Sequence, residues 1–179
     1  KDYRGKLVLP GMVDLHLHAP QYAYRGTKMD LPLLDWLNIN TFPEEAKYRD
    51  TDYARVAYRN FVEDLKESPT TRAVIFGTLH KDATLCLMEL LEESGLETMA
   101  GKVNMDRNSP DYLTEHSAEE SLKNTVNWLE EIPQDYQHCH PILTPRFTPT
   151  CSDTLMEGLG KLMRERNLPL QSHLSENKA

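Results

Sequence analysis

The feature that most restricts the possible folds is an alternation of extended and helical hydrophobic patterns along the chain. Apolar runs bounded by turn residues predict strands at residues 7–17, 72–77, 98–103, 140–144 and 168–174. Between them, apolar residues recur at steps of three and four and predict helices at residues 51–68, 83–94, 117–132 and 152–166. The expected N-caps are Thr51 or Asp52, Ser117, and Ser152 or Asp153, and Gly95 is an expected C-cap. A strand followed by helix–strand units is typical of an α/β fold, in which helices cover a parallel sheet.

Two architectures have this alternation, an open doubly wound sheet and a (βα)8 barrel. Neither Gly-x-Gly-x-x-Gly nor a Walker loop follows a predicted strand, which argues against the open sheets that bind nucleotides. A complete barrel needs about 250 residues and eight strands, whereas this chain has 179 residues. If the fold is a barrel, the chain supplies only part of it.

Composition excludes several classes of function. The net charge of −8 and the isoelectric point near 5.4 argue against sequence-independent binding to nucleic acid, which requires a basic face. No apolar run approaches the roughly 20 residues that span a bilayer, and no signal sequence opens the chain. We therefore expect a cytoplasmic protein without a membrane partner. Cys86, Cys139 and Cys151 lack close spacing, so reduced and packed thiols are expected.

Two histidines one residue apart lie near the end of the first predicted strand. Because side chains alternate between the faces of a strand, His16 and His18 project from the same face, together with Asp14. A third histidine, His173, lies near the end of the last predicted strand. Three neutral imidazoles with an open fourth position form a catalytic zinc site. Alternating polar residues on a half-solvated strand give the same spacing, so the pattern alone leaves both interpretations open.

The position of the histidines along the strands favours the metal site. The carboxyl ends of parallel strands meet at one edge, where ligand-binding groups gather. Glu176 follows His173 by three residues and is placed either to exchange a proton with a metal-bound water or to lie solvated at a helix start. His138 and His140 repeat the spacing at the start of a predicted strand, where we expect no metal site.

Residues 19–49 form a long connection that is rich in proline but also in apolar and aromatic residues such as Trp36 and Phe42. A solvated linker would be more polar, and long ordered loops often serve function. We expect a packed wall or lid of a pocket, with a helical turn at residues 33–37; a purely structural loop is the alternative.

Residues 10–18, Pro-Gly-Met-Val-Asp-Leu-His-Leu-His, resemble the first-strand signature of the amidohydrolase superfamily of metal-dependent barrel hydrolases. Longer blocks resemble the guanine deaminases of that superfamily and occur in the same order, at residues 18–22, 30–37, 41–43, 144–147 and 171–177. The resemblance implies a partial (βα)8 TIM-like barrel, strands 1–5 with their helices. It also implies zinc-dependent hydrolytic deamination of guanine to xanthine and ammonia.

The same resemblance implies roles for individual residues. His16, His18 and His173 would bind one zinc ion, and Glu176 would carry the proton to the purine ring. The residues implied to line the guanine pocket are His18, Ala19, Pro20, Gln21, Arg146, Phe147, His173 and Glu176.

The family pattern extends beyond this chain, with a histidine on strand six, an aspartate on strand eight and a small β-sandwich. The resemblance therefore implies that residues 1–9 are a remnant of the sandwich and residues 10–179 the amino-terminal portion of the barrel. It also implies a homodimer for the full-length protein. Two alternatives stay open: a related deaminase or chlorohydrolase acting on another heterocycle, and a catalytically inactive barrel that serves as a binding module.

Overall fold

Parallel strands form the centre of the computed structural model, which describes residues 2–175. One sheet contains, in spatial order, β1 (Met12–His18), β2 (Thr70–Phe76), β3 (Glu97–Gly101) and β5 (Cys139–Pro141). The short strands β4 (Val103–Asn104) and β6 (Thr144–Pro145) form a second parallel pair. The α/β class and the parallel sheet predicted from the alternation are confirmed, and the arrangement is that of a partial (βα)8 barrel.

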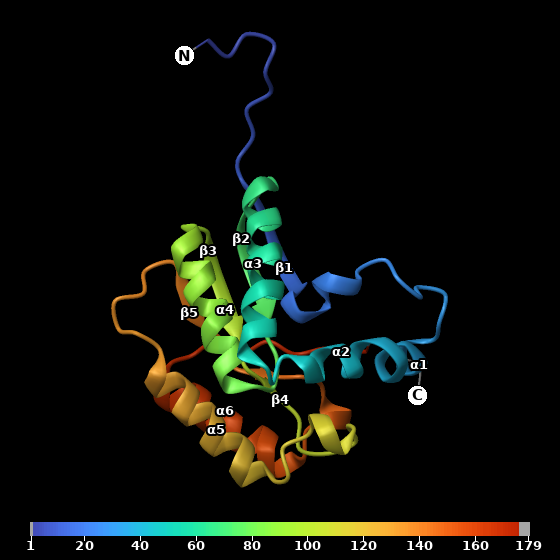
Figure 1. Cartoon of the computed structure of the whole chain (residues 1–179). Coiled ribbons are helices and arrows are strands. Elements are labelled where there is room, and N and C mark those ends of the chain that lie inside the picture. The colour runs from blue at the N-terminus through green and yellow to red at the C-terminus, as the bar shows by residue number, and fades with distance from the viewer. Residues whose placement is uncertain (1, 176–179) are drawn as a thin grey trace.

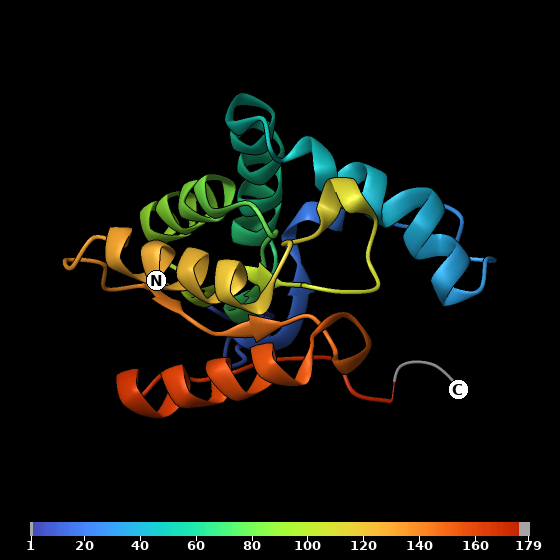
Figure 2. The same cartoon turned by 90° about the horizontal axis from the view of Figure 1, so that it is seen from below.

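The long helices follow one another in an arc around the strands (Figures 1 and 2). They are α3 (Thr51–Glu67), α4 (Lys81–Ser94), α5 (Ala118–Glu131) and α6 (Asp153–Arg166). Each helix packs against the next in this order. Within residues 2–175, no helix has the length and apolar character needed to cross a membrane.

Local sequence signals account for the ends of these helices. Ser117 and Ser152 each accept a backbone N–H from the first turn of α5 and α6, at 3.1 and 3.2 Å, and Gly95 ends α4 with a φ of 71°. These three caps are confirmed predictions. The N-cap of α3 is Asp50, whose carboxylate accepts two backbone N–H groups. The predicted N-caps, Thr51 and Asp52, are instead the first two residues of the helix.

The first strand is shorter than predicted. It begins at Met12, whose N–H donates to the carbonyl of Pro69 at 2.9 Å, because its partner β2 begins only at Thr70. Residues 2–11 form no strand in the described part of the chain and extend away from the sheet (Figure 1).

The last predicted strand, residues 168–174, is extended but forms only isolated bridges, Leu143 with Leu170 and Phe147 with His173. Its neighbouring segment is broken into β5 and β6. Prolines explain the interruption, since Pro141, Pro145 and Pro169 have no N–H to donate to a ladder.

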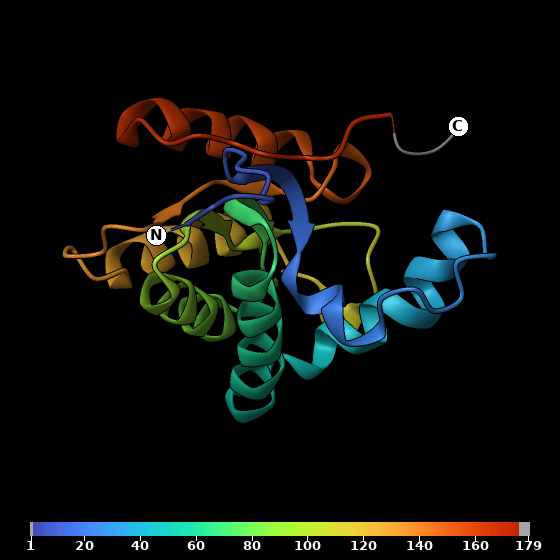
Figure 3. The ribbon, with the colours of Figure 1, turned by 90° about the horizontal axis from the view of Figure 1, so that it is seen from above.

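The connection between β1 and α3 is mostly helical. It contains a 3-10 helix η1 (Ala19–Tyr24), α1 (Leu33–Trp36), a π-helical turn η2 (Leu37–Thr41) and α2 (Phe42–Lys47). Figure 3 shows this segment leaving the end of β1 and returning to α3. Leu37 and Phe42 pack in one buried cluster with Phe76 at the end of β2. The predicted helical turn at residues 33–37 is confirmed within a larger packed wall.

The main core lies between the sheet and the helices. Ala73 and Ile75 of β2 are buried against α3 and α4, where Tyr58 and Leu87 are fully buried. Because side chains alternate along a strand, the residues of β2 next to Ala73 and Ile75 face the side of the sheet away from the helices. The helices thus hold the strands in place while their carboxyl ends remain available.

Candidate metal centre

Three imidazole rings meet at the carboxyl ends of the strands. His16 and His18 lie on β1, and His173 lies on the extended segment after α6. One nitrogen of each ring lies within 4.8 Å of the other two. The Nε2 atoms of His18 and His173 are 3.0 Å apart. Across residues 2–175, this is the one group of three or more His, Cys, Asp or Glu side chains with such a spacing.

An irregularity in β1 lies beside these histidines. The step from Asp14 to Leu17 in β1 is paired with the shorter step from Ala73 to Ile75 in β2, so the alternation of faces shifts by one residue. The carboxylate of Asp14 accepts the backbone N–H of His16 at 3.0 Å and does not belong to the group of three. The bulge therefore separates Asp14 from the histidines, which simple alternation did not predict.

Hydrogen bonds indicate where the ring protons of His173 and His18 are located. Nδ1 of His173 lies 2.6 Å from the backbone carbonyl of Arg146, which only accepts, so Nδ1 carries the proton and Nε2 keeps its lone pair. The side-chain nitrogen of Gln21 donates to Nδ1 of His18 at 3.1 Å, so the proton of this neutral ring is on Nε2, which donates to Nε2 of His173 at 3.0 Å. A carbonyl partner on the outer nitrogen is the usual arrangement for a metal-binding histidine. The donor set of three imidazoles fits zinc.

Phe76, at the end of β2, forms an aromatic platform for the three rings. Its ring is stacked on His18 at 4.5 Å and 13°, and its centroid lies 4.5 Å from His173 and 5.2 Å from His16. Phe76 is 1% exposed. Sequence reasoning missed this residue because it reads as the last apolar position of a buried strand.

Electrostatics keep His18 neutral. Burial lowers its pKa well below the ordinary value, and the positive charge of Arg146 and the neighbouring imidazoles His173 and His16 lower it further. A neutral imidazole is the form that binds metals. At neutral pH, His18 therefore carries no positive charge.

Arg146 lies beside the histidines and is held by a carboxylate that the sequence did not single out. Its Nη1 donates to Oε2 of Glu45 at 2.6 Å and its Nη2 to Oε1 at 3.1 Å, and the two side chains are 4% and 1% exposed. Glu45 comes from α2, 101 positions away in the sequence. Only the block Thr41-Phe42-Pro43, which overlaps the start of α2, pointed to this region, and nothing distinguished Glu45 from Glu44.

A cavity of about 240 Å³ adjoins these groups. The predicted site residues that line it are His16, His18, Gln21, Arg146, Phe147 and His173. Leu33, Trp36 and Leu37 complete its wall, so the long connection does form part of a pocket. Ala19 and Pro20 are buried in η1 between His18 and Gln21, and their contact with a ligand stays a prediction. Glu176 lies outside the described residues.

The remaining histidines lie apart from this cavity. His80 follows β2, and burial, followed by Arg49 and Lys102, lowers its pKa to about 4. His138 precedes β5 and lies 3.0 Å from a carboxylate oxygen of Glu97. Among residues 2–175, neither His138 nor His140 belongs to a cluster of potential metal ligands.

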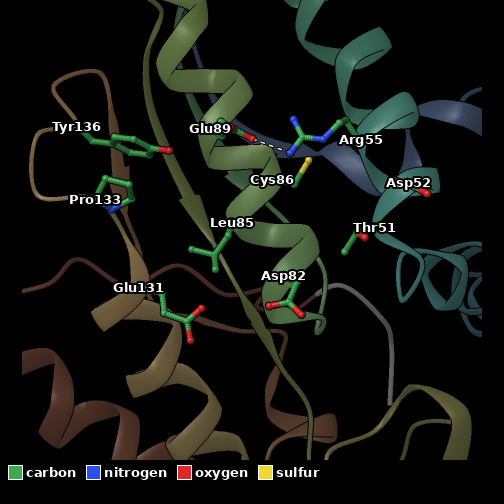
Figure 4. Close-up of a pocket in the computed structure, with 10 residues that line it drawn as sticks. All are labelled: Thr51, Asp52, Arg55, Asp82, Leu85, Cys86, Glu89, Glu131, Pro133 and Tyr136. Atoms are coloured by element: carbon green, nitrogen blue, oxygen red, sulfur yellow. Dashed lines mark hydrogen bonds and ion pairs between the residues drawn. The ribbon is translucent and has the colours of Figure 1, made fainter.

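A larger cleft of about 600 Å³ lies between α3, α4 and the segment after α5 (Figure 4). None of its lining residues borders the histidine cavity. It contains an ion pair between Arg55 and Glu89 at 2.8 Å and the buried thiol of Cys86, whose pKa is raised by burial. A protonated thiol is a weak nucleophile, so the smaller histidine cavity is the better candidate for chemistry.

Comparisons with known proteins point to one family. The Amidohydrolase family profile matches residues 7–179. A guanine deaminase of Mus musculus is 45% identical over 173 residues, which are 95% of this chain and 38% of that protein. The chain thus spans less than half the length of this relative.

Solved structures agree with that match. The crystal structure of guanine deaminase from C. acetobutylicum, with guanine bound in its active site, has a TM-score of 0.90 and 51% identity, covering 94% of this chain and 40% of that one. A triazine hydrolase from Arthobacter aurescens has a TM-score of 0.80 at 16% identity, covering 94% of this chain and 41% of that one. The second likeness concerns the fold alone.

Proposed function

The chain belongs to the amidohydrolase family, and on that premise we propose that it forms part of a zinc-dependent enzyme that hydrolyses guanine to xanthine and ammonia. The observation that carries the proposal is the convergence of His16, His18 and His173 with Arg146 around one cavity. The 45% identity to a guanine deaminase favours guanine over other heterocycles.

The proposed reaction exchanges an amine for an oxygen. Water adds to the ring carbon that bears the exocyclic amine, the C–N bond breaks with a proton transferred to nitrogen, and ammonia leaves as the oxygen becomes a carbonyl. Held by His16, His18 and His173, zinc would lower the pKa of water towards about 7 and so supply the nucleophile at neutral pH.

The chain's own residues would bind and orient the base. Arg146 lines the cavity with a guanidinium whose fixed donors suit a carbonyl oxygen of the base. Phe147 and Gln21 also line the cavity, where the ring of Phe147 would stack on the base and the amide of Gln21 would hydrogen-bond to it. Glu176 is the proposed proton carrier, three residues after His173.

We also propose that residues 10–179 are the amino-terminal portion of the barrel and residues 1–9 a remnant of a β-sandwich. In support, β1 pairs with β2 alone within the described residues, and Val13 and Leu15 are 57% and 71% exposed. An open strand edge with exposed apolar side chains is an aggregation hazard unless another segment covers it.

The test is ammonia release from guanine, measured on the 179-residue chain and on the full-length polypeptide that contains it, both supplied with zinc. Adenine and cytosine are the controls. We expect turnover of guanine by the full-length polypeptide alone. Turnover of another heterocycle in preference to guanine would support a related deaminase or chlorohydrolase instead. Zinc-loaded protein that binds guanine without releasing ammonia would support the binding module.

For the full-length protein we propose a homodimer located in the cytoplasm, on the strength of the family resemblance. Light scattering after size-exclusion chromatography measures the oligomer, and cell fractionation measures the location. A monomer, or a protein found with the membranes, would contradict this part of the proposal.

A further inference from the structure

We propose that Glu45 is a positioning residue that holds Arg146 so that the remaining N–H donors of the guanidinium face the ligand in the histidine cavity. The inference rests on the proposed function, which it deepens by adding a residue that determines specificity for an oxo-purine. Glu45 does not line the cavity, whereas Arg146 does.

The ion pair has a defined geometry. Each carboxylate oxygen of Glu45 accepts from a different terminal nitrogen of Arg146, at 2.6 and 3.1 Å. This contact uses the end of the guanidinium fork that lies opposite Nε. Such a two-point, charge-assisted contact fixes the plane of the guanidinium as well as its position.

The contact leaves one edge of Arg146 available. A guanidinium has five N–H donors, and Glu45 takes one from each terminal nitrogen. Among the described residues, no hydrogen bond is made by Nε–H of Arg146. Nε–H and the neighbouring Nη–H form a second pair of parallel donors, which matches a ligand with adjacent acceptors, such as a ring carbonyl and a ring nitrogen.

Glu45 also balances charge. With its carboxylate in contact, Glu45 neutralises the guanidinium inside a site where both side chains are almost wholly buried. An unpaired arginine at this depth would turn towards solvent or recruit another acceptor, and either change would misplace the donors.

The chain offers matched controls. Glu44 is the neighbouring glutamate of α2, but it pairs with Lys47 at 2.6 Å. Glu115 forms a second buried ion pair, with Nζ of Lys102 at 2.7 Å, and the two side chains are 4% and 1% exposed. Neither glutamate lines the histidine cavity. Glu115→Gln therefore reports the general effect of breaking a buried ion pair.

The experiment measures binding in the zinc-free full-length polypeptide, where no turnover interferes. The ligands are guanine and 2-aminopurine, which lacks the 6-oxo group; the fluorescence of 2-aminopurine reports its own binding, and guanine is measured by competition. The variants are Glu45→Gln, Arg146→Lys, the double variant, Glu44→Gln and Glu115→Gln. Urea unfolding of each variant confirms that it is folded under the binding conditions.

We expect Glu45→Gln to weaken guanine binding about 10- to 100-fold, the range for lost hydrogen bonds to a charged group, and to change 2-aminopurine binding by less than about 3-fold. In the Arg146→Lys background, Glu45→Gln should have little further effect, because it acts through the arginine. Glu44→Gln and Glu115→Gln should preserve the ratio of the two affinities.

The inference is overturned if Glu45→Gln weakens both ligands equally, if its effect persists in the Arg146→Lys background, or if the wild-type protein does not prefer guanine. Failure of the proposed function has a different signature. If the zinc-loaded wild-type protein binds guanine but releases no ammonia, deamination is excluded while the ratio of affinities still decides the role of Glu45.

Discussion

Two histidine pairs in this chain have the same spacing and different surroundings. His16 and His18 end β1 and meet His173 over the ring of Phe76. His138 and His140 flank Cys139 at the beginning of β5. There, His138 contacts Glu97 at 3.0 Å, and the two side chains are 39% and 47% exposed.

The two pairs differ because the first lies at the carboxyl end of its strand and the second at the amino end. At the carboxyl edge, separate strands and the segment after α6 bring a third imidazole and an aromatic platform to the first pair. At the amino edge, His138 of the second pair contacts only the solvent-exposed carboxylate of Glu97 among the described ion pairs. The His-x-His spacing thus acquires a meaning only from its position in the parallel sheet.

The sharpest way to test this comparison is to remove one histidine from each edge. We expect His173→Ala to weaken zinc binding more than about 100-fold, since even the loss of an outer hydrogen-bond partner costs about 10- to 100-fold. His140→Ala should bind zinc as the wild-type protein does. Competition with a chromophoric chelator measures both affinities, and an equal loss in the two variants would refute the distinction between the edges.

A smaller effect is expected from the platform under the imidazoles. Phe76→Leu should lower zinc affinity about 10-fold, because the three rings lose the surface that fixes their orientation. The free energy of unfolding should fall by about 1–2 kcal/mol, less than the roughly 3–5 kcal/mol of full truncation to alanine. The matched control is Phe61→Leu in the helical core, which should cost similar stability in urea unfolding. Equal zinc losses in both variants would show that Phe76 acts only through stability.

Much of the frame could be predicted from local signals. The caps at Ser117 and Ser152 and the turn at Gly95 depend on residues a few positions apart, and the structure has all three. The three histidines were also found from the sequence, because parallel strands bring their carboxyl ends to one edge whatever lies between them.

What escaped prediction depends on contacts between distant segments. Glu45 meets Arg146 across 101 positions, and Phe76 reaches the imidazoles only once β1 and β2 are paired. The shift of register after Asp14 follows from that pairing as well, so single-strand alternation placed Asp14 with the histidines. Tertiary packing decides such features, and spacing within one segment carries no signal for them.

His80 allows a further test at the carboxyl edge, through pH. Burial lowers its pKa to about 4, so between pH 6.5 and 4 the unfolded chain binds a proton that the folded chain does not. Stability therefore falls as pH drops through this window. We expect His80→Gln to flatten the fall by an amount on the order of 1 kcal/mol, allowing for partial exposure, measured by urea unfolding at pH 7 and pH 4.5. An unchanged slope would show that His80 titrates normally.

The smallest effect should come from the amino edge. The hydrogen bond from His138 lowers the pKa of Glu97, so any stability it contributes is present above the ordinary carboxyl pKa and is lost as pH falls through the lowered value. Because both side chains are exposed and screened by salt, Glu97→Gln should shift the melting temperature at pH 7 by less than about 1 °C and leave zinc affinity unchanged. A loss of zinc here would mean that the amino-edge pair supports the metal centre from across the sheet, and the contrast between the two edges would then fail.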